Sequence, residues 1–74
     1  MSKLPVIKPK ELERILLVVG FERIRQKGSH AFYKHLDGRY TVIPHHSTRD
    51  LAPNLLRKIL KEINLDIGEF RKLI

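Results

Sequence analysis

Glycine divides the middle of the chain into three short segments, and this pattern limits the fold more than any other feature. Residues 21–26, 31–36 and 40–43 are rich in the aromatic and β-branched side chains that favour strands. A tight turn is predicted at Lys27-Gly28, and Asp37-Gly38 predicts a type I′ hairpin turn, in which both central residues have positive φ. Because the connections are short, we expect a three-stranded antiparallel meander that ends at Pro44.

The segments on either side of these strands have the periodicity of helices. After Pro9, which suits a first helical turn, apolar residues recur at helical spacing as far as Val19. A second amphipathic helix begins near Pro53 or Asn54, and Asp66 with the glutamate three residues later predicts a capped short final helix. Residues 1–74 are therefore expected to form a single α+β domain, ordered α-β-β-β-α plus a C-terminal helix, with both long helices on one face of the sheet.

The charge of the chain indicates a polyanionic partner. Fifteen Lys and Arg stand against eight Asp and Glu, which gives a net charge of +7 and a pI near 10.2. Nucleic acid is the partner that this excess favours, although small domains also carry surplus lysine on a solvated surface. Without cysteine, the chain has no disulfide framework, thiolate metal site or thiol nucleophile. The longest apolar run, residues 15–19, is too short for a bilayer and no signal peptide is evident, so we expect a cytoplasmic protein without membrane contact.

The second strand has two different faces. Alternation places Ala31, Tyr33 and His35 on one face and His30, Phe32 and Lys34 on the other. We favour the first set toward the helices, which leaves a histidine, an aromatic ring and a lysine on the open face. The alternative, in which Phe32 is a core residue, stays open at this point.

The histidines at positions 30, 35, 45 and 46 suggest proton-transfer chemistry. Imidazole titrates near pH 6.5, so one ring can accept a proton while another donates one. That pairing suits RNA cleavage, in which a 2′-hydroxyl loses a proton and a 5′-oxygen gains one, with Lys or Arg stabilising the phosphate charge. Directly opposite residues of antiparallel strands lie close together, so a loop that leaves the third strand can bring His45 or His46 toward the second strand.

Judged from the local residues alone, His30 is more often an ordinary polar surface residue than a catalytic one. A zinc site has little support, because cysteine and an HExxH helix are both lacking. Ser29 lacks the G-x-S-x-G context of a nucleophile. Gly28 and Ser29 can instead shape the turn and present an N–H and a hydroxyl to a phosphate.

Several motifs together resemble the HicA family of toxins, also called YcfA-like proteins, over residues 12 to about 70. The G-S-H followed two residues later by an aromatic is specific when its flanking motifs accompany it. The residues that carry the resemblance are Gly20-Phe21, Arg25-Gln26-Lys27-Gly28-Ser29-His30, Tyr33, Pro44-His45-His46 and Leu56-Arg57-Lys58-Ile59-Leu60.

The resemblance implies a double-stranded-RNA-binding-like fold and an endoribonuclease toxin, associated with stress response, that acts on messenger RNA. It further implies a HicB-like antitoxin that covers the active site, and neither a metal nor an organic cofactor. The catalytic histidine of the family is that of the G-S-H motif, hence His30, and a histidine at His45 or His46 is a recurring feature. Many members have glycine and a small residue where this chain has Pro53-Asn54, and we expect Asn54 to act as the helix N-cap.

The leading hypothesis is therefore an RNA endonuclease in which His30 is general acid or base, with His45, His46 and Ser29 as candidates for catalytic support. Phe32 or Tyr33 would stack on an unpaired base of single-stranded RNA. The phosphate backbone of the RNA would be held by Arg25, Lys27, Gly28 and Lys34. Two alternatives remain open, a non-catalytic RNA-binding module of the same fold and a domain whose main role is protein association.

Overall fold

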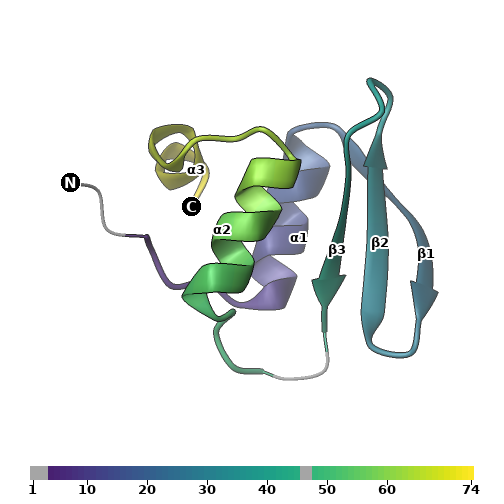
Figure 1. Ribbon diagram of the computed structural model, residues 1–74, viewed down its shortest axis with the longest axis horizontal. Coiled ribbons are helices and arrows are strands. Elements are labelled where there is room, and N and C mark those ends of the chain that lie inside the picture. The colour runs from purple at the N-terminus through teal and green to yellow at the C-terminus, as the bar shows by residue number, and fades with distance from the viewer. Residues whose placement is uncertain (1–3, 46–47) are drawn as a thin grey trace.

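The computed structural model describes residues 4–45 and 48–74, and its elements follow the predicted order. None of the helices in these two ranges has the length and apolar character that a membrane span requires. The elements are α1 (Pro9–Val18), β1 (Phe21–Lys27), β2 (His30–His35), β3 (Tyr40–Pro44), α2 (Pro53–Glu62) and α3 (Ile67–Leu73) (Figure 1). The prediction of an α+β fold with a short C-terminal helix is confirmed.

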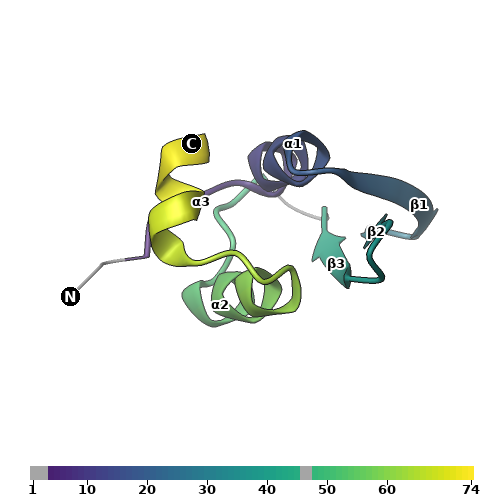
Figure 2. The same ribbon diagram turned by 90° about the horizontal axis from the view of Figure 1, so that it is seen from above.

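The molecule is built in layers. The sheet is antiparallel with strand order β1-β2-β3. Figures 1 and 2 show α1 and α2 on one face of this sheet, and α3 on the side of the two long helices that is away from the strands. None of the helices in the described residues lies on the other face of the sheet, as the sequence pattern predicted.

A single apolar core fills the space between the sheet and the helices. The stripe of α1 predicted from periodicity is buried, as is the corresponding face of α2, and Phe70 of α3 contributes a fully buried ring. The largest fully buried apolar side chains are Tyr33, Phe70, Ile7, Leu12, Ile15, Leu16, Ile43, Leu56, Ile59 and Ile63.

Both hairpin turns differ in detail from the predictions. The first turn consists of Gly28-Ser29, one residue later than predicted, because β1 continues through Lys27. The type I′ prediction for the second turn is wrong, because positive φ occurs at Gly38 (99°) but not at Asp37. A three-residue loop replaces it, closed by the His35 N–H, which donates to the Arg39 carbonyl at 2.9 Å. Such loops need a left-handed residue only at their third position, which is where Gly38 lies.

One of the two predicted helix caps is present. At α3, the Asp66 carboxylate accepts the Glu69 N–H at 2.8 Å and the Glu69 side chain reaches back to the Asp66 N–H at 3.5 Å, which confirms the capping box. The prediction of an Asn54 cap at α2 is wrong. Ala52 is the N-cap residue there, because Pro53 takes the first helical position, for which its fixed φ is suited, and Asn54 falls inside the first turn.

Candidate active site on the open face of the sheet

A β-bulge in β1 decides which side chains share a face with His30. Arg23 lies opposite Tyr33 and Arg25 lies opposite Phe32, so Ile24 is an extra residue in β1. An inserted residue moves every later side chain of the strand to the other face. Arg23 is therefore on the helix side, whereas Arg25 is on the open side of the sheet.

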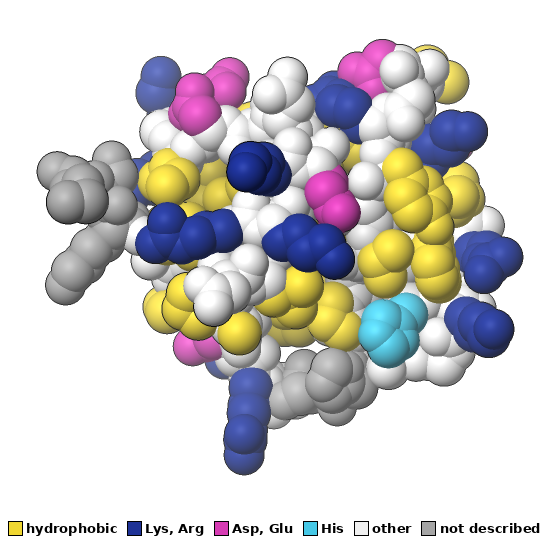
Figure 3. All heavy atoms as spheres, in the orientation of Figure 1, with side chains coloured by type: hydrophobic (Ala, Val, Ile, Leu, Met, Phe, Trp, Pro, Cys, Tyr) yellow, Lys and Arg dark blue, Asp and Glu magenta, His cyan; other side chains and the backbone are white. Residues whose placement is uncertain are grey.

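The bulge gathers basic and aromatic side chains around β2. Lys27 lies directly opposite His30, and the pairing of β2 with β3 adds a second aromatic ring to this face. In Figure 3, hydrophobic side chains and a histidine gather over the strands at the right, with Lys and Arg along the outer margin. We call this surface the open face; its main residues are Arg25, Lys27, His30, Phe32, Lys34, Tyr40, Val42 and Pro44.

Three flat groups lie in contact in the middle of the open face. The Arg25 guanidinium carbon is 4.6 Å from the centroid of the Phe32 ring. On the other side of Phe32, the Tyr40 ring lies with its centroid 6.1 Å away, and Tyr40 is 45% exposed. Phe32 is only half-buried, so the alternative in which it is a core residue is wrong. Tyr40 was not predicted as a site residue. The signal was its spacing, because residues two apart in a strand share a face and Tyr40 lies two residues before Val42.

His30 is the first residue of β2 and is exposed. It lies next to the Gly28-Ser29 turn and opposite both Lys27 and Pro44. Gly28 is exposed, with φ of 59° and open space around the position that a Cβ would occupy. The turn, His30 and Lys27 thus lie on one exposed part of the surface, with the two side chains on the same face of the sheet.

Tyr33 does not belong to this surface, and its predicted role in base stacking is wrong. Its ring is 0% exposed because it packs under the helices with the core. The Tyr33 hydroxyl donates a hydrogen bond to Oε2 of Glu13 on α1. Burial, with the hydrogen bond and charge of Glu13, raises the pKa of this hydroxyl, so Tyr33 remains a protonated donor.

The backbone of His45 lies beside the residue that precedes His30, but the His45 side chain is on the opposite side of the sheet. The backbone N–H of His45 donates to the Ser29 carbonyl at 2.6 Å, and Nε2 of its ring is 2.9 Å from the Tyr33 hydroxyl. Burial lowers the pKa of His45; Arg23 and Lys10 act in the same direction, against Glu13. The neutral imidazole is thus favoured on the helix side.

The other two histidines are His35 and His46. His35 is on the helix side of β2, where its ring meets the Phe21 ring edge-on with the two ring centroids 5.2 Å apart. His46 lies outside the described residues. Within residues 4–45 and 48–74, no group of three or more His, Cys, Asp or Glu side chains is arranged to hold a metal ion.

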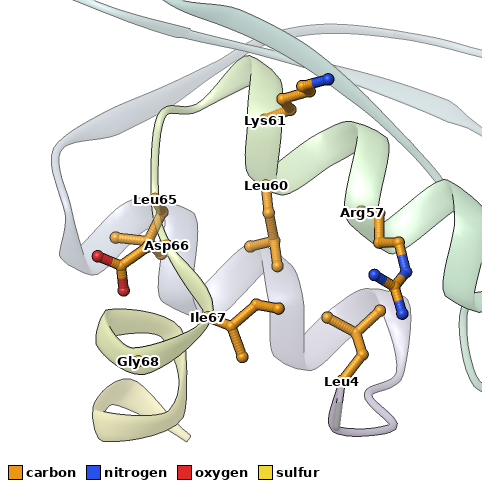
Figure 4. A pocket seen from close by; sticks show the side chains of 8 residues that line it. All are labelled: Leu4, Arg57, Leu60, Lys61, Leu65, Asp66, Ile67 and Gly68. Atoms are coloured by element: carbon orange, nitrogen blue, oxygen red, sulfur yellow. The ribbon is translucent and has the colours of Figure 1, made fainter. Parts of the chain in front are cut away.

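One cavity of the described residues lies away from the open face. It has a volume of about 600 Å³ and is formed by α2, α3 and the N-terminal segment. Figure 4 shows Leu4, Leu60 and Ile67 directed toward one another in it, with Arg57 at one side. No residue of the open face lines it.

The fold and the open face define a small α+β domain with a basic, histidine-containing sheet surface. A family model described as the HicA toxin of bacterial toxin-antitoxin systems matches residues 9–65. The chain therefore belongs to the HicA toxin family and is a toxin of the toxin-antitoxin class. A comparison with curated protein sequences finds no match.

Proposed function

We propose that this toxin is an endoribonuclease that cuts single-stranded stretches of messenger RNA, with His30 as a catalytic acid or base. The observation that carries the proposal is the exposed His30 imidazole on a surface that also bears Lys27, Arg25 and two accessible rings. Membership of a family that generally cleaves RNA supports the same reaction.

The proposed reaction needs one base, one acid and stabilisation of phosphate charge. The 2′-oxygen forms a bond to phosphorus as a base takes its proton, and the bond from phosphorus to the 5′-oxygen breaks as an acid supplies a proton. The products are a 2′,3′-cyclic phosphate and a 5′-hydroxyl. His30 fills one proton-transfer role, and Lys27, directly opposite it, faces the charge that develops on the phosphate.

Binding in this proposal combines phosphate contacts with base stacking. Lys34 and Arg25 hold the backbone, and the Gly28-Ser29 turn offers an N–H and a hydroxyl beside His30. The Phe32 and Tyr40 rings face an unpaired base, with stacking worth about 1–3 kcal/mol per base. Because paired bases cannot splay onto a flat surface, this arrangement favours single-stranded RNA.

The protein partner follows from the family and from the charge of the open face. We propose that a HicB-like antitoxin inhibits the toxin by covering His30 in the cytoplasm. Arg25, Lys27 and Lys34 would then pair with carboxylates of the antitoxin, so mixing the two proteins should stop cleavage in proportion to the complex formed.

The test is cleavage of an unstructured RNA by the purified protein, with and without a metal chelator. Wild-type protein should cleave equally in both, and His30→Ala should reduce the rate by about 10²–10⁴-fold. Lys58→Ala, an exposed change on α2, serves as the control and should keep the wild-type rate. Salt-sensitive RNA binding without cleavage by the wild type would instead establish the non-catalytic RNA-binding module, and equal rates for His30→Ala would remove His30 from the mechanism.

A further inference from the structure

A chain of polar side chains runs behind the sheet, directly beneath the turn that carries His30. Its centre is Glu13 of α1, whose Oε2 accepts hydrogen bonds from the Tyr33 hydroxyl and from Nη1 of Arg23, the latter at 3.1 Å. The Glu13 side chain is 17% exposed and the Arg23 side chain 39%. The bulge at Ile24 is what turns Arg23 to this side of the sheet.

Both ends of this polar chain reach the Gly28-Ser29 turn. On one side, Arg23 donates to the Gln26 side chain, whose Nε2 donates to the Gly28 carbonyl at 3.0 Å. On the other side, Nε2 of the His45 ring lies 2.9 Å from the Tyr33 hydroxyl, and the backbone N–H of His45 donates to the Ser29 carbonyl at 2.6 Å. The two carbonyls that precede His30 are thus both held by partners that lead back to Glu13.

Counting protons fixes the direction of the bonds. Tyr33 has a single hydroxyl hydrogen, and it is donated to the Glu13 carboxylate. The Tyr33 oxygen can therefore only accept from His45, which requires the hydrogen of the neutral imidazole to be on Nε2. Removing the Glu13 acceptor oxygen would free the tyrosine hydrogen, and nothing would then favour this tautomer of His45.

We infer that Glu13 and Tyr33 are positioning residues, which hold the Gly28-Ser29 turn from behind the sheet and so fix where His30 points on the open face. This inference rests on the proposed cleavage by His30. Neither residue touches RNA, since Tyr33 is fully buried and Glu13 lies on α1 behind the sheet. A small displacement of a catalytic group is enough to cost about 10²-fold in rate.

The test compares Tyr33→Phe and Glu13→Gln with Thr41→Val. Thr41 lies opposite Tyr33 in β3 and its buried hydroxyl donates to Glu62 at 2.8 Å, so Thr41→Val removes one hydrogen bond from the same layer without touching the turn. We expect Tyr33→Phe to lower kcat by about 10- to 100-fold with KM for RNA nearly unchanged, at a temperature where every variant is folded. Thr41→Val should lose stability but keep kcat.

A second measurement separates this inference from the proposed cleavage. In the wild type, the nitrogen NMR signals of His45 should report hydrogen on Nε2, and Tyr33→Phe should alter these signals together with the Gly28, Ser29 and His30 amides. Glu13→Gln keeps an acceptor for the Tyr33 hydroxyl, so this variant should retain more of kcat and more of the wild-type His45 signal than Tyr33→Phe does. If the wild type fails to cleave RNA, the proposed function falls while the NMR arm still decides the coupling. Unchanged turn signals, or a kcat of Tyr33→Phe equal to that of Thr41→Val, would overturn the inference.

Discussion

Two histidines meet at the end of the β1–β2 hairpin in opposite surroundings. His30 is exposed on the open face, whereas His45 faces the helices and bonds the Tyr33 hydroxyl. Their backbones are adjacent, since the His45 N–H donates to the carbonyl of Ser29. An exposed imidazole can exchange protons with a substrate, while a half-buried one with a fixed partner serves the structure. Alternation along the second strand predicted the open face for His30, but the sequence did not show whether His45 or His46 approaches that strand or which face it takes.

The surroundings of His45 predict how acid affects stability. Its pKa is lowered from 6.5 mainly by burial, with Arg23 and Lys10 adding to the effect and Glu13 opposing it. The unfolded chain therefore binds this proton more readily than the folded chain, and the free energy of unfolding falls as pH drops below about 6.5 through the lowered pKa. The neutral Tyr33 hydroxyl beside it does not titrate in this range.

Denaturant unfolding at about pH 7.5 and about pH 5.5 checks this expectation. The wild type should lose stability between them by no more than about 1.4 kcal/mol per pH unit for one proton. His45→Gln keeps an N–H donor for Tyr33 but cannot titrate, so its loss should be smaller. An equal loss in both proteins would show that His45 is not the group responsible.

Gly20 and Gly38 offer a matched pair for backbone strain and steric contact. Their φ angles are 102° and 99°, a region that costs a residue with a Cβ about 1–3 kcal/mol. A Cβ at Gly20 would also lie 2.8 Å from Nε2 of His35, whereas one at Gly38 meets nothing within 4 Å. Gly20→Ala should therefore lower the free energy of unfolding more than Gly38→Ala. Equal losses in thermal or denaturant unfolding would show that the His35 ring moves aside without cost.

Among the elements, β1 is the one whose side chains could not be assigned to the two faces of the sheet from the sequence. Alternation assigned the faces of β2 correctly, because β2 itself contains no inserted residue; the extra residue of the bulge is in β1, and the register of β2 with β3 is regular. In β1, Ile24 has the side chain of an ordinary strand residue, so the sequence does not mark it as the inserted residue of a β-bulge. Without the bulge, Arg25 and Lys27 would share the helix side with Arg23, and the open face would lose both cations.

The open face of the sheet predicts an RNA affinity that depends on Phe32. Phe32→Leu removes the ring between Arg25 and Tyr40, and should weaken binding to a short unstructured RNA by about 1–3 kcal/mol. Fluorescence anisotropy in a His30→Ala background measures this without cleavage. Leu17→Ala, an exposed apolar residue of α1, is the control and should leave binding unchanged. If Phe32→Leu binds as tightly as the control, stacking on this ring is not part of recognition.

Across the whole molecule, local signals predicted the elements, but contacts between distant residues built the site. The helices, from their periodicity, and the Asp66 cap were predicted correctly because each depends on neighbours in the chain, whereas the glycines marked where the two turns lie but not their exact residues or type. Glu13 and Tyr33 are 20 residues apart, and their hydrogen bond exists only because α1 packs over β2. No composition or spacing marks Glu13, an ordinary acidic residue in an amphipathic helix, as the centre of hydrogen bonds that lead to the Gly28-Ser29 turn.

The layers of the molecule also separate its tasks. The helix side of the sheet contains the core and the polar chain centred on Glu13, and the open face presents much of the site's positive charge with His30. A net charge of +7 attracts polyanions in general, so in the proposed function a choice between RNA and an acidic protein surface would depend on contacts with the open face. An antitoxin that occupies this face would exclude RNA by direct competition.

The most direct test of the account is cleavage of one mapped RNA with a single sugar changed. The wild type should cut the all-ribose strand to a 2′,3′-cyclic phosphate and a 5′-hydroxyl, and should not cut there when the sugar at the cleaved position is 2′-deoxyribose. His30→Ala should bind both strands and cut neither. Cleavage of the deoxy-substituted position, or cleavage by His30→Ala at the wild-type rate, would contradict attack by the 2′-hydroxyl with His30 as its acid or base.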